Sequence, residues 1–340
     1  MDFFGLDIGS YNLKVVQLAK RGKELQLVSF GSGPSTHKGL VSEAEADFNA
    51  LAEAIKKLHR EAKMTTKNVT TALPQDQVFT RTVNLPPLSE EELKSAIKWE
   101  AEQYVPIPLE EVTLAHQIVG EIKIDTRQKT QVLIVAAPKR LIEKTLKVLK
   151  AAGLNPVGLE TEIVALARSL VPPDGEIALV VDLGAKATDM AVVEKGLVVY
   201  SRSIATAGEA LTRSIATGLG LDPTQAEAYK KAYGADPQKL EGKVREAIGP
   251  ILAVMVKEIE KTIAYYYTET KKTVNRIILS GGTAGLPEVV SLMASQLSLE
   301  IQVGDPFVQI KMEDTLKKQF SQAQSSFYAV AVGLAMKELG

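Results

Sequence analysis

Two short segments of the chain combine an aspartate, a glycine and a small residue in a pattern that could bind phosphate. They are Asp7-Ile8-Gly9-Ser10 and Asp182-Leu183-Gly184-Ala185. A tight turn between two strands can point successive backbone N–H groups at one phosphate, and glycine permits the positive φ or the close approach to ligand that such a turn needs. An aspartate at the start of the turn can hold Mg²⁺, usually through water. A single Asp-x-Gly is also a common ordinary turn, so the prediction rests on its repetition about half the chain further on.

Two further features could complete a phosphate site. Lys14 follows the first motif on the returning strand, and its ammonium group could reach a β- or γ-phosphate, although it could equally face solvent. The segment 279–285 runs from an apolar strand through Gly281-Gly282-Thr283 into a predicted helix. A helix N-terminus with bare backbone suits a nucleotide, although a plain strand-to-helix turn has the same pattern. The segment lacks both the Gly-Lys-Ser/Thr of a P-loop and the spacing of a dinucleotide fingerprint.

Composition and charge narrow the classes of function. The 340 residues are 45% hydrophobic and 24% charged with a formal net charge of −1, which is typical of a globular protein of two domains and argues against general nucleic-acid binding. The chain has no cysteine, and its histidines (His37, His59 and His116) lie far apart in sequence, so we expect no thiolate or histidine metal site. No signal peptide or membrane-spanning run is evident, so we expect a cytoplasmic protein.

The predicted elements place the two motifs in similar halves. An antiparallel meander begins with each motif, from strands over 3–8, 12–19 and 25–30, and again over 178–183, 188–193 and 198–203. We interpret this similarity as an ancient duplication. The other predicted elements are helices over 46–63, 208–218, 223–233, 239–271, 285–296 and 326–337, and strands over 69–73, 276–279 and 299–303.

Residues 78–153 are predicted to form a separate α+β unit inserted in the first half. After a strand over 77–85, Pro86-Pro87 interrupts the chain, and Ser89-Glu90-Glu91-Glu92 is a capping box that begins a helix ending near Tyr104. Strands over 112–120 and 130–137 and a helix over 139–152 follow. Gly153 ends that helix, and a strand over 156–160 comes next.

The order of the three glycine sites strongly resembles the superfamily of actin, the sugar kinases and the seventy-kilodalton chaperones. Asp7, Ser10 and Lys14 fall at the spacing of the first phosphate motif, Asp182-Leu183-Gly184 matches the second, and 279–283 resembles the adenosine motif. Residues 162–165 and 329–335 resemble the two connecting helices. The resemblance implies an α/β fold, namely the actin-like, duplicated, ribonuclease H-like two-domain fold. Its expected parts are a first subdomain (1–77, 154–177 and 327–340), an insert (78–153) of the FtsA/PilM type, and a second domain (178–326).

The insert narrows the resemblance to two bacterial families. Its position is similar to that in the cell-division protein FtsA and in the PilM family of type IV pilus assembly, and Ala96–Pro108 closely resembles the latter. FtsA ends in a basic amphipathic membrane helix, and we expect none here because the chain stops at Gly340. The PilM resemblance implies a protein of pilus assembly and twitching motility at the inner face of the inner membrane. It would touch the membrane only through partners.

The expected partners are the N-terminal cytoplasmic tail of the inner-membrane protein PilN and other proteins of the pilus platform. The resemblance implies that the PilN peptide sits in a groove between the first subdomain and the insert, in the region of residues 78–150. An extended peptide could lie against a strand edge near Trp99, Tyr104 and Val105, which could equally form the insert's own core.

The resemblance also implies a site for ATP or ADP with Mg²⁺. Asp7 and Asp182 would hold the metal through water, and Glu162 would orient an attacking water. Gly208 and Glu209 resemble the ribose side of the site. Glu258 and Lys261 resemble its adenine side, although their spacing also fits a surface ion pair. The expected nucleotide-binding residues are Gly9, Ser10, Tyr11, Asn12, Lys14, Gly184, Ala185, Lys186, Gly208, Glu209, Glu258, Lys261, Gly281, Gly282 and Thr283.

Two residues of the second hairpin depart from the family pattern. Ala185 stands where relatives often carry Gly or Asp, and Lys186 interrupts the usual run of small residues. The remaining carboxylates suffice for binding, so we expect ATP binding with weak or no hydrolysis. The alternatives are an FtsA-like filament protein of cell division and a small-molecule kinase of the same superfamily.

Overall fold

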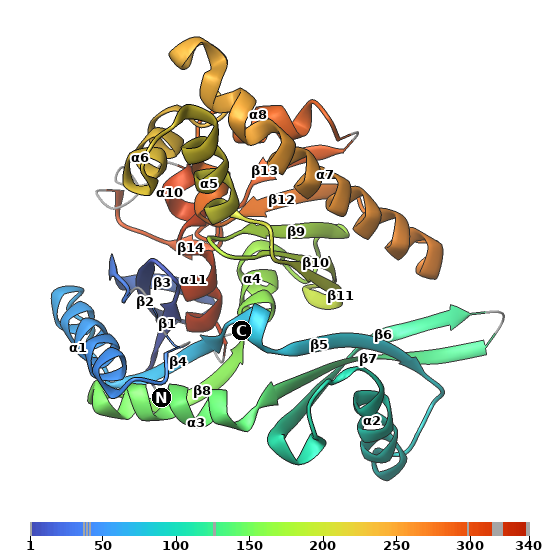
Figure 1. Ribbon diagram of the computed structural model, residues 1–340. Helices are drawn as coiled ribbons and strands as arrows, with labels where there is room; N and C mark the ends of the chain where they lie inside the picture. The colour runs from blue at the N-terminus through green and yellow to red at the C-terminus, as the bar shows by residue number, and fades with distance from the viewer. Residues whose placement is uncertain are drawn as a thin grey trace.

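The computed structural model describes residues 2–36, 38, 40, 42–124, 127–297, 299–314 and 322–337. Its first half is built on a six-stranded sheet in the order β14-β3-β2-β1-β4-β8. The first three strands in sequence form an antiparallel meander, and β4 and β8 continue the sheet in parallel with β1 (Figure 1). The strands are β1 (Phe4–Ile8), β2 (Asn12–Arg21), β3 (Glu24–Pro34), β4 (Asn68–Leu73), β8 (Asn155–Thr161) and β14 (Ile310–Lys311).

The second half repeats this topology. Its five-stranded sheet has the order β11-β10-β9-β12-β13, with three antiparallel strands followed by two parallel ones. This is the order of β3-β2-β1-β4-β8 in the first sheet, so the expected duplicated actin-like fold is confirmed. The strands are β9 (Ala178–Leu183), β10 (Thr188–Glu194), β11 (Leu197–Ile204), β12 (Arg276–Ser280) and β13 (Glu300–Val303).

Two short apolar helices lie between the sheets. Helix α4 (Glu162–Leu170) follows β8, and α11 (Ala329–Ala335) returns from the second half to pack against it. The two helices come unusually close at Gly333, where a Cβ would lie 1.9 Å from the carbonyl oxygen of Ala165. Arg168 of α4 also donates to the Gly333 carbonyl at 2.7 Å. These are the segments expected to connect the two halves.

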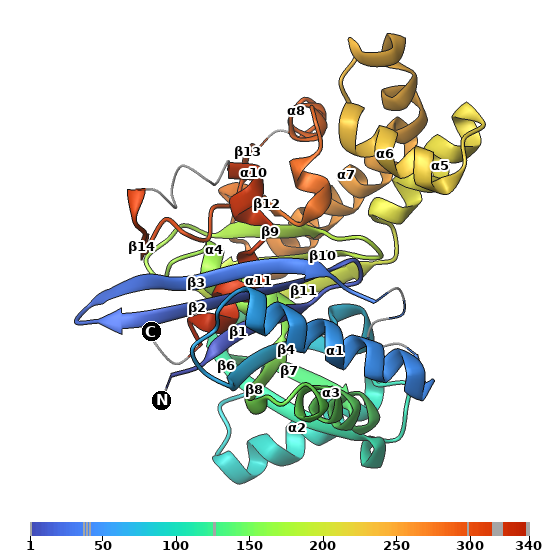
Figure 2. The same cartoon turned by 90° about the vertical axis from the view of Figure 1, so that its left-hand side faces the viewer.

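Helices α1 (Glu45–Glu61) and α3 (Lys139–Ala151) cover the outer face of the first sheet, as Figure 2 shows. Leu51 and Ile55 of α1 share one buried cluster with Val148 and Leu149 of α3. Helix α3 was predicted as part of the insert, but its apolar face packs on the first half.

The helices of the second half lie on the opposite side of the molecule in Figure 2. They are α5 (Gly208–Leu219), α6 (Pro223–Tyr233), α7 (Lys243–Thr270) and α8 (Val289–Ala294). The helix predicted over 285–296 is shorter, because the chain first makes a 3-10 turn at Gly282–Gly285 and Glu288 then takes a left-handed φ of 55°. Pro287, which lacks a backbone N–H, lies in the interruption.

The insert is a three-stranded sheet in the order β5-β7-β6 with one helix. Its elements are β5 (Phe79–Leu85), α2 (Glu90–Tyr104), β6 (Val112–Ile124) and β7 (Arg127–Pro138). The Ser89 capping box of α2 is present as predicted. One sheet face packs on α2 through Val83, Ile97 and Val132, and from the other face Val119 and Leu133 join the core of the second half.

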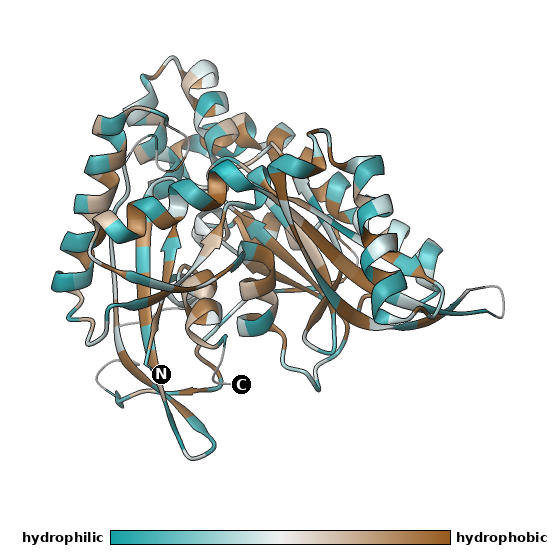
Figure 3. Ribbon diagram, turned by 90° about the horizontal axis from the view of Figure 1, so that it is seen from below, coloured by the Kyte–Doolittle hydropathy of each residue, from teal (hydrophilic) through white to brown (hydrophobic). Residues whose placement is uncertain are grey.

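Hydropathy follows this layering. Figure 3 shows the sheet strands largely brown and the outward faces of the covering helices largely teal. Within the described ranges, no helix is long and apolar enough to cross a membrane.

Candidate functional site

The two Asp-x-Gly segments form hairpins with the same backbone geometry. Between β1 and β2, the Gly9 N–H donates to the Asn12 carbonyl oxygen at 3.1 Å, and between β9 and β10 the Gly184 N–H donates to the Ala187 carbonyl oxygen at 3.1 Å. A Cβ on either glycine would lie 2.8 Å from that same oxygen. Both turns therefore need glycine for the close approach of their own backbone.

The hairpins differ in the residue opposite each aspartate. Asp7 lies opposite Lys14 in the β1–β2 ladder, and their side chains form a part-buried ion pair at 2.6 Å. Asp182 lies opposite a second carboxylate, Asp189, in the β9–β10 ladder. Asp189 Oδ1 is buried and has no hydrogen-bond partner among the described residues. The first hairpin is thus neutralised internally, whereas the second carries two acids.

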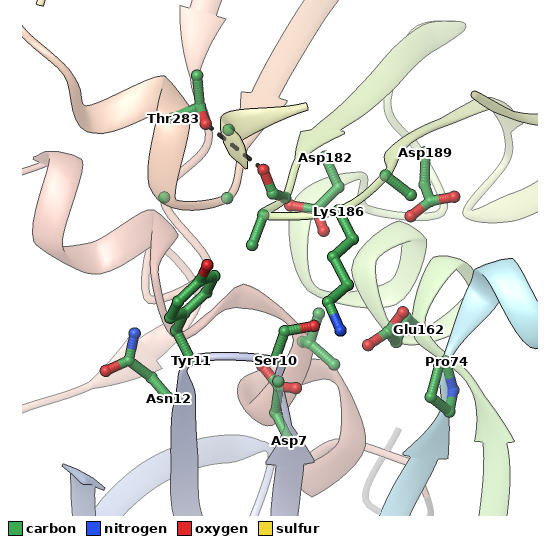
Figure 4. Close-up of a pocket in the computed structure, with 18 of the residues that line it drawn as sticks. Asp7, Ser10, Tyr11, Asn12, Pro74, Glu162, Asp182, Lys186, Asp189 and Thr283 are labelled. Atoms are coloured by element: carbon green, nitrogen blue, oxygen red, sulfur yellow. Dashed lines mark hydrogen bonds between the residues drawn. The ribbon is translucent and has the colours of Figure 1, made fainter. Parts of the chain in front are cut away.

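The hairpins line one cavity between the two halves, with a volume of about 260 Å³. Figure 4 shows Asp7, Ser10 and Tyr11 on one side and Asp182, Lys186 and Thr283 on the other. Both connecting helices reach it, through Glu162 and Val330. The predicted site residues that line it are Asp7, Gly9, Ser10, Tyr11, Asn12, Lys14, Glu162, Asp182, Gly184, Ala185, Lys186, Gly208, Glu209, Gly281, Gly282 and Thr283.

Burial perturbs the carboxylates of the second hairpin. It raises the pKa of Asp182 to about 6, with the negative charge of Asp7 adding to the rise and Lys14 opposing it. Burial also raises the pKa of Asp189 to about 7, assisted by the charges of Asp182 and Asp76 and opposed by a hydrogen bond from Ser203. Desolvation disfavours the ionised form, so this side of the cavity favours a proton or a bound cation.

Glu162, the first residue of α4, also lines the cavity and is partly buried. Burial raises its pKa well above the ordinary value, and the charges of Asp7 and Asp189 add to the rise. Its Oε2 accepts a hydrogen bond from the Gln75 backbone N–H at 3.0 Å, which fixes the carboxyl group. The pKa of Lys14 is also raised. Burial would lower it, but the negative charges of Asp7 and the neighbouring acids outweigh that effect.

The Gly281-Gly282-Thr283 segment packs directly against the second hairpin. Gly281 has a φ of 84°, and a Cβ there would lie 2.6 Å from Asp182 Oδ1. A Cβ at Gly282 would meet no atom within 4 Å, so its bare backbone faces open space. Thr283 Oγ1 donates to the Gly184 carbonyl oxygen at 3.5 Å. The segment therefore combines a close approach to the hairpin with room for a ligand.

The N-terminus of α5 is joined to the same hairpin. The backbone N–H groups of Gly208 and Glu209 donate to the carbonyl oxygens of Gly184 and Ala185, at 3.1 and 2.8 Å. These N–H groups are thus engaged within the protein, which leaves side chains and bare backbone for ligand contact. Glu209 also accepts a hydrogen bond at 3.2 Å from the hydroxyl of Tyr11, which bridges the two halves across the cavity.

The adenine-side prediction for Glu258 and Lys261 needs correction. They form an i, i+3 ion pair at 2.6 Å on α7, Glu258 also pairs with Arg202 of β11, and neither residue lines the cavity. Their spacing reflects a pair on the helix surface, which was the alternative interpretation.

Glu227 and Lys230 of α6 line the cavity instead, and sequence reasoning missed them. Lys230 is buried, lies 2.6 Å from the Glu227 carboxylate and donates to the Gly208 carbonyl oxygen at 3.0 Å. The same Glu-x-x-Lys spacing is present in their sequence, but only the tertiary packing shows which helix faces the cavity.

Sequence reasoning also missed the turn after β4. Pro74, Asp76 and Gln77 line the cavity, whereas Gln75 points away and donates through Nε2 to Thr80 of the insert at 3.1 Å. Together with its bond to Glu162, this places Gln75 between the cavity and the insert.

The residues predicted to contact a peptide lie in three environments. Trp99 is 62% exposed on α2, Tyr104 is half-buried beneath Arg81, and Val105 is buried in the core of the insert. Val105 is therefore a core residue rather than a contact, which corrects the prediction, and Trp99 has the accessible side chain.

Comparisons with known proteins agree with this architecture. The family model described as type IV pilus assembly protein PilM matches residues 5–339. A solved structure of a PilM–PilN type IV pilus biogenesis complex is 28% identical, with a TM-score of 0.84, and the match covers 100% of this chain and 99% of that one.

The chain is also similar to more distant proteins. FtsA of Streptococcus pneumoniae serotype 2 (strain D39) is 23% identical over 89% of this chain and 75% of its own length. The structure of MreB 5 of Spiroplasma citri bound to AMPPNP is 15% identical, with a TM-score of 0.52 over 99% of this chain and 96% of that one. The family match over nearly the whole sequence, together with the shared topology, shows that the chain belongs to the type IV pilus assembly protein PilM family.

Proposed function

We propose that the protein is an ATP-binding component of type IV pilus assembly that holds the cytoplasmic N-terminal tail of PilN. The proposal of nucleotide binding rests on the two equivalent hairpins, which face one cavity. Each hairpin brings a tight glycine turn and an aspartate to that cavity, and the Gly282 backbone faces open space beside them. Two glycine turns opposed in this way suit the successive phosphates of one nucleotide.

The donor set also fits Mg²⁺ carried by the nucleotide. The described part of the chain brings no three Asp, Glu, His or Cys side chains together as a metal cage. Mg²⁺ commonly uses one or two carboxylates, several waters and the phosphates themselves, and Asp7 and Asp182 match that mode. When bound, Mg²⁺ would offset the negative charge of the phosphates.

We expect ATP turnover to be weak. We assign the orientation of an attacking water to Glu162, but its raised pKa favours the neutral carboxyl group, which is a poor hydrogen-bond acceptor for that water. The second hairpin contributes only the apolar Ala185 and Ala187 beside Lys186. Binding, rather than hydrolysis, is therefore the expected role of the site.

The partner assignment rests on the PilM–PilN complex, which is similar to this chain over its whole length. We place the peptide beside the insert, where Trp99 presents an accessible aromatic surface and β5 and β6 are the edge strands of the sheet. Through PilN the protein would be held at the cytoplasmic face of the inner membrane, near the other platform proteins.

Calorimetric titration of the full chain with ATP-Mg²⁺ and, separately, with the PilN tail peptide tests both parts. Binding of each is expected, and the absence of heat from both titrations would overturn the proposal. Asp182→Ala should weaken binding of Mg²⁺-nucleotide while the chain stays folded. Asp174→Ala is the matched control, since Asp174 is exposed and outside the cavity. Unchanged affinity in Asp182→Ala would show that the phosphate assignment is wrong.

A further inference from the structure

The lysines that line the cavity are not equivalent. Lys14 is paired with Asp7 at 2.6 Å and Lys38 with Asp47 at 3.1 Å. Lys230 and Lys231 share the Glu227 carboxylate, at 2.6 and 3.2 Å. Lys186 is the remaining cavity lysine, and among the described residues no carboxylate lies within ion-pair distance of it.

Lys186 is also placed to reach across the cavity. It lies at the tip of the second hairpin, one residue before the Ala187 carbonyl that closes the turn, as Tyr11 precedes Asn12 in the first hairpin. Figure 4 shows its side chain extending from the second half toward Ser10 and Glu162. The side chain is exposed, so its ammonium group is hydrated and free to move onto an anion.

The acidic side chains around the hairpin tips indicate where a bound phosphate would need a cation. Asp7, Asp182 and Asp189 line this side of the cavity, and Lys14 already neutralises Asp7. A phosphate placed between the hairpin tips would meet the negative charge of the remaining carboxylates whenever they are ionised. The repulsion grows with each added phosphate charge, because unscreened charges interact strongly at a buried site. An unpaired ammonium at the tip of the second hairpin offsets this repulsion for the phosphate that comes nearest to it.

We propose that Lys186 binds the terminal phosphate of ATP and thereby lets the protein distinguish ATP from ADP. The Lys186 ammonium group, which belongs to the second half, donates hydrogen bonds to oxygens of the γ-phosphate. The first hairpin contacts the phosphates from the first half. ADP has no phosphate at this position and leaves Lys186 without a partner. The inference rests on the proposed nucleotide function and assigns its specificity to one residue.

The assignment changes the meaning of the departure at this hairpin. A lysine between Ala185 and Ala187 interrupts a run of small residues, yet it supplies the charge that the flanking alanines cannot. A triphosphate would then contact both halves at once, through the first hairpin and Lys186, whereas a diphosphate would lose the second of these contacts.

The test compares ATP and ADP affinities, each with Mg²⁺, by calorimetry on the full chain. Lys186→Met removes the charge and keeps the chain length, Lys186→Arg keeps the charge, and Lys150→Met makes the same change at an exposed site on α3 away from the cavity. Lys186→Met should weaken ATP roughly tenfold or more, as expected for loss of a hydrogen bond to a charged group, and change ADP affinity by less than about twofold. Lys186→Arg should keep most of the preference for ATP, and Lys150→Met should keep all of it.

Two results would overturn the inference. The first is an ATP-to-ADP affinity ratio that is equal in wild type and Lys186→Met, which would show that Lys186 does not sense the terminal phosphate; if both affinities fell equally, Lys186 would be a general phosphate contact. If the wild-type chain binds neither nucleotide, the proposed function fails as well. Thermal unfolding of each variant shows whether a lost affinity reflects a lost fold.

Discussion

Lys14 and Asp189 occupy equivalent positions in the two hairpins, one opposite Asp7 and the other opposite Asp182. The duplicated topology therefore places a cation in one half where the other half has an acid. This single difference leaves the first hairpin with an ion pair at 2.6 Å and the second with two carboxylates, whose pKa values desolvation raises to about 6 and about 7.

The first prediction concerns the pH dependence of stability. Asp189 has a folded-state pKa of about 7 and an ordinary value of about 3.9 in the unfolded chain. Between these values the folded state binds more protons than the unfolded state, so Asp189 makes the nucleotide-free protein less stable as the pH rises toward about 7.

Asp189→Asn removes this dependence and should raise the free energy of unfolding at pH 8 by about 1–3 kcal/mol relative to wild type, since one unit of pKa shift is worth about 1.4 kcal/mol. The difference should shrink at pH 5. Urea unfolding at both pH values measures it, with the exposed Asp174→Asn as control. A wild-type slope that persists in Asp189→Asn would contradict the assignment.

The second prediction concerns the crossing of the connecting helices. A Cβ at Gly333 would lie 1.9 Å from the Ala165 carbonyl oxygen, which the backbone of α4 holds in place. Gly333→Ala should therefore destabilise the protein by about 3 kcal/mol, the upper end of the usual cost of overpacking. Chemical denaturation measures this change.

Gly249→Ala in the second turn of α7 is the control for Gly333→Ala. Apart from its chain neighbours, a Cβ at Gly249 would meet nothing within 4 Å, and the better helix propensity of alanine is opposed by the ring of Pro250, so the free energy of unfolding should change by less than about 1 kcal/mol. Equal effects at the two glycines would be inconsistent with a tight helix crossing.

The third prediction separates ligand binding from stability. A Cβ at Gly282 would point into open space beside the hairpins. Gly282→Ala should therefore leave the free energy of unfolding within about 0.5 kcal/mol of wild type, as for other substitutions away from packed groups. It should weaken nucleotide binding, because the methyl group occupies space that the ligand needs. Calorimetry on Gly282→Ala and Gly249→Ala checks this, and equal affinities would place the nucleotide elsewhere.

The features that sequence predicted well are those that local rules determine. The Ser89 capping box, the meander strands and the two glycine turns depend on neighbours in sequence, and the structure contains each of them. The repeated order of strands followed from recognising one motif twice.

The features that sequence missed depend on which faces meet in three dimensions. Glu227-x-x-Lys230 and Glu258-x-x-Lys261 have the same helical spacing, and only the packing of α6 beside α5 brings the first pair to the cavity. Helix α3 looked like part of the insert because it follows β7 directly. Its apolar residues, however, pack in the same buried cluster as those of α1. The two-residue strand β14 is too short to leave a pattern in sequence.

The Gly184 carbonyl oxygen links three segments of the second half. It accepts hydrogen bonds from the Gly208 N–H at 3.1 Å and from the Thr283 hydroxyl at 3.5 Å, so three segments of the second half share one anchor. A displacement of the hairpin tip would therefore shift the start of α5 and the glycine turn with it, so that a ligand bound at the hairpin is coupled to both segments through a single backbone oxygen.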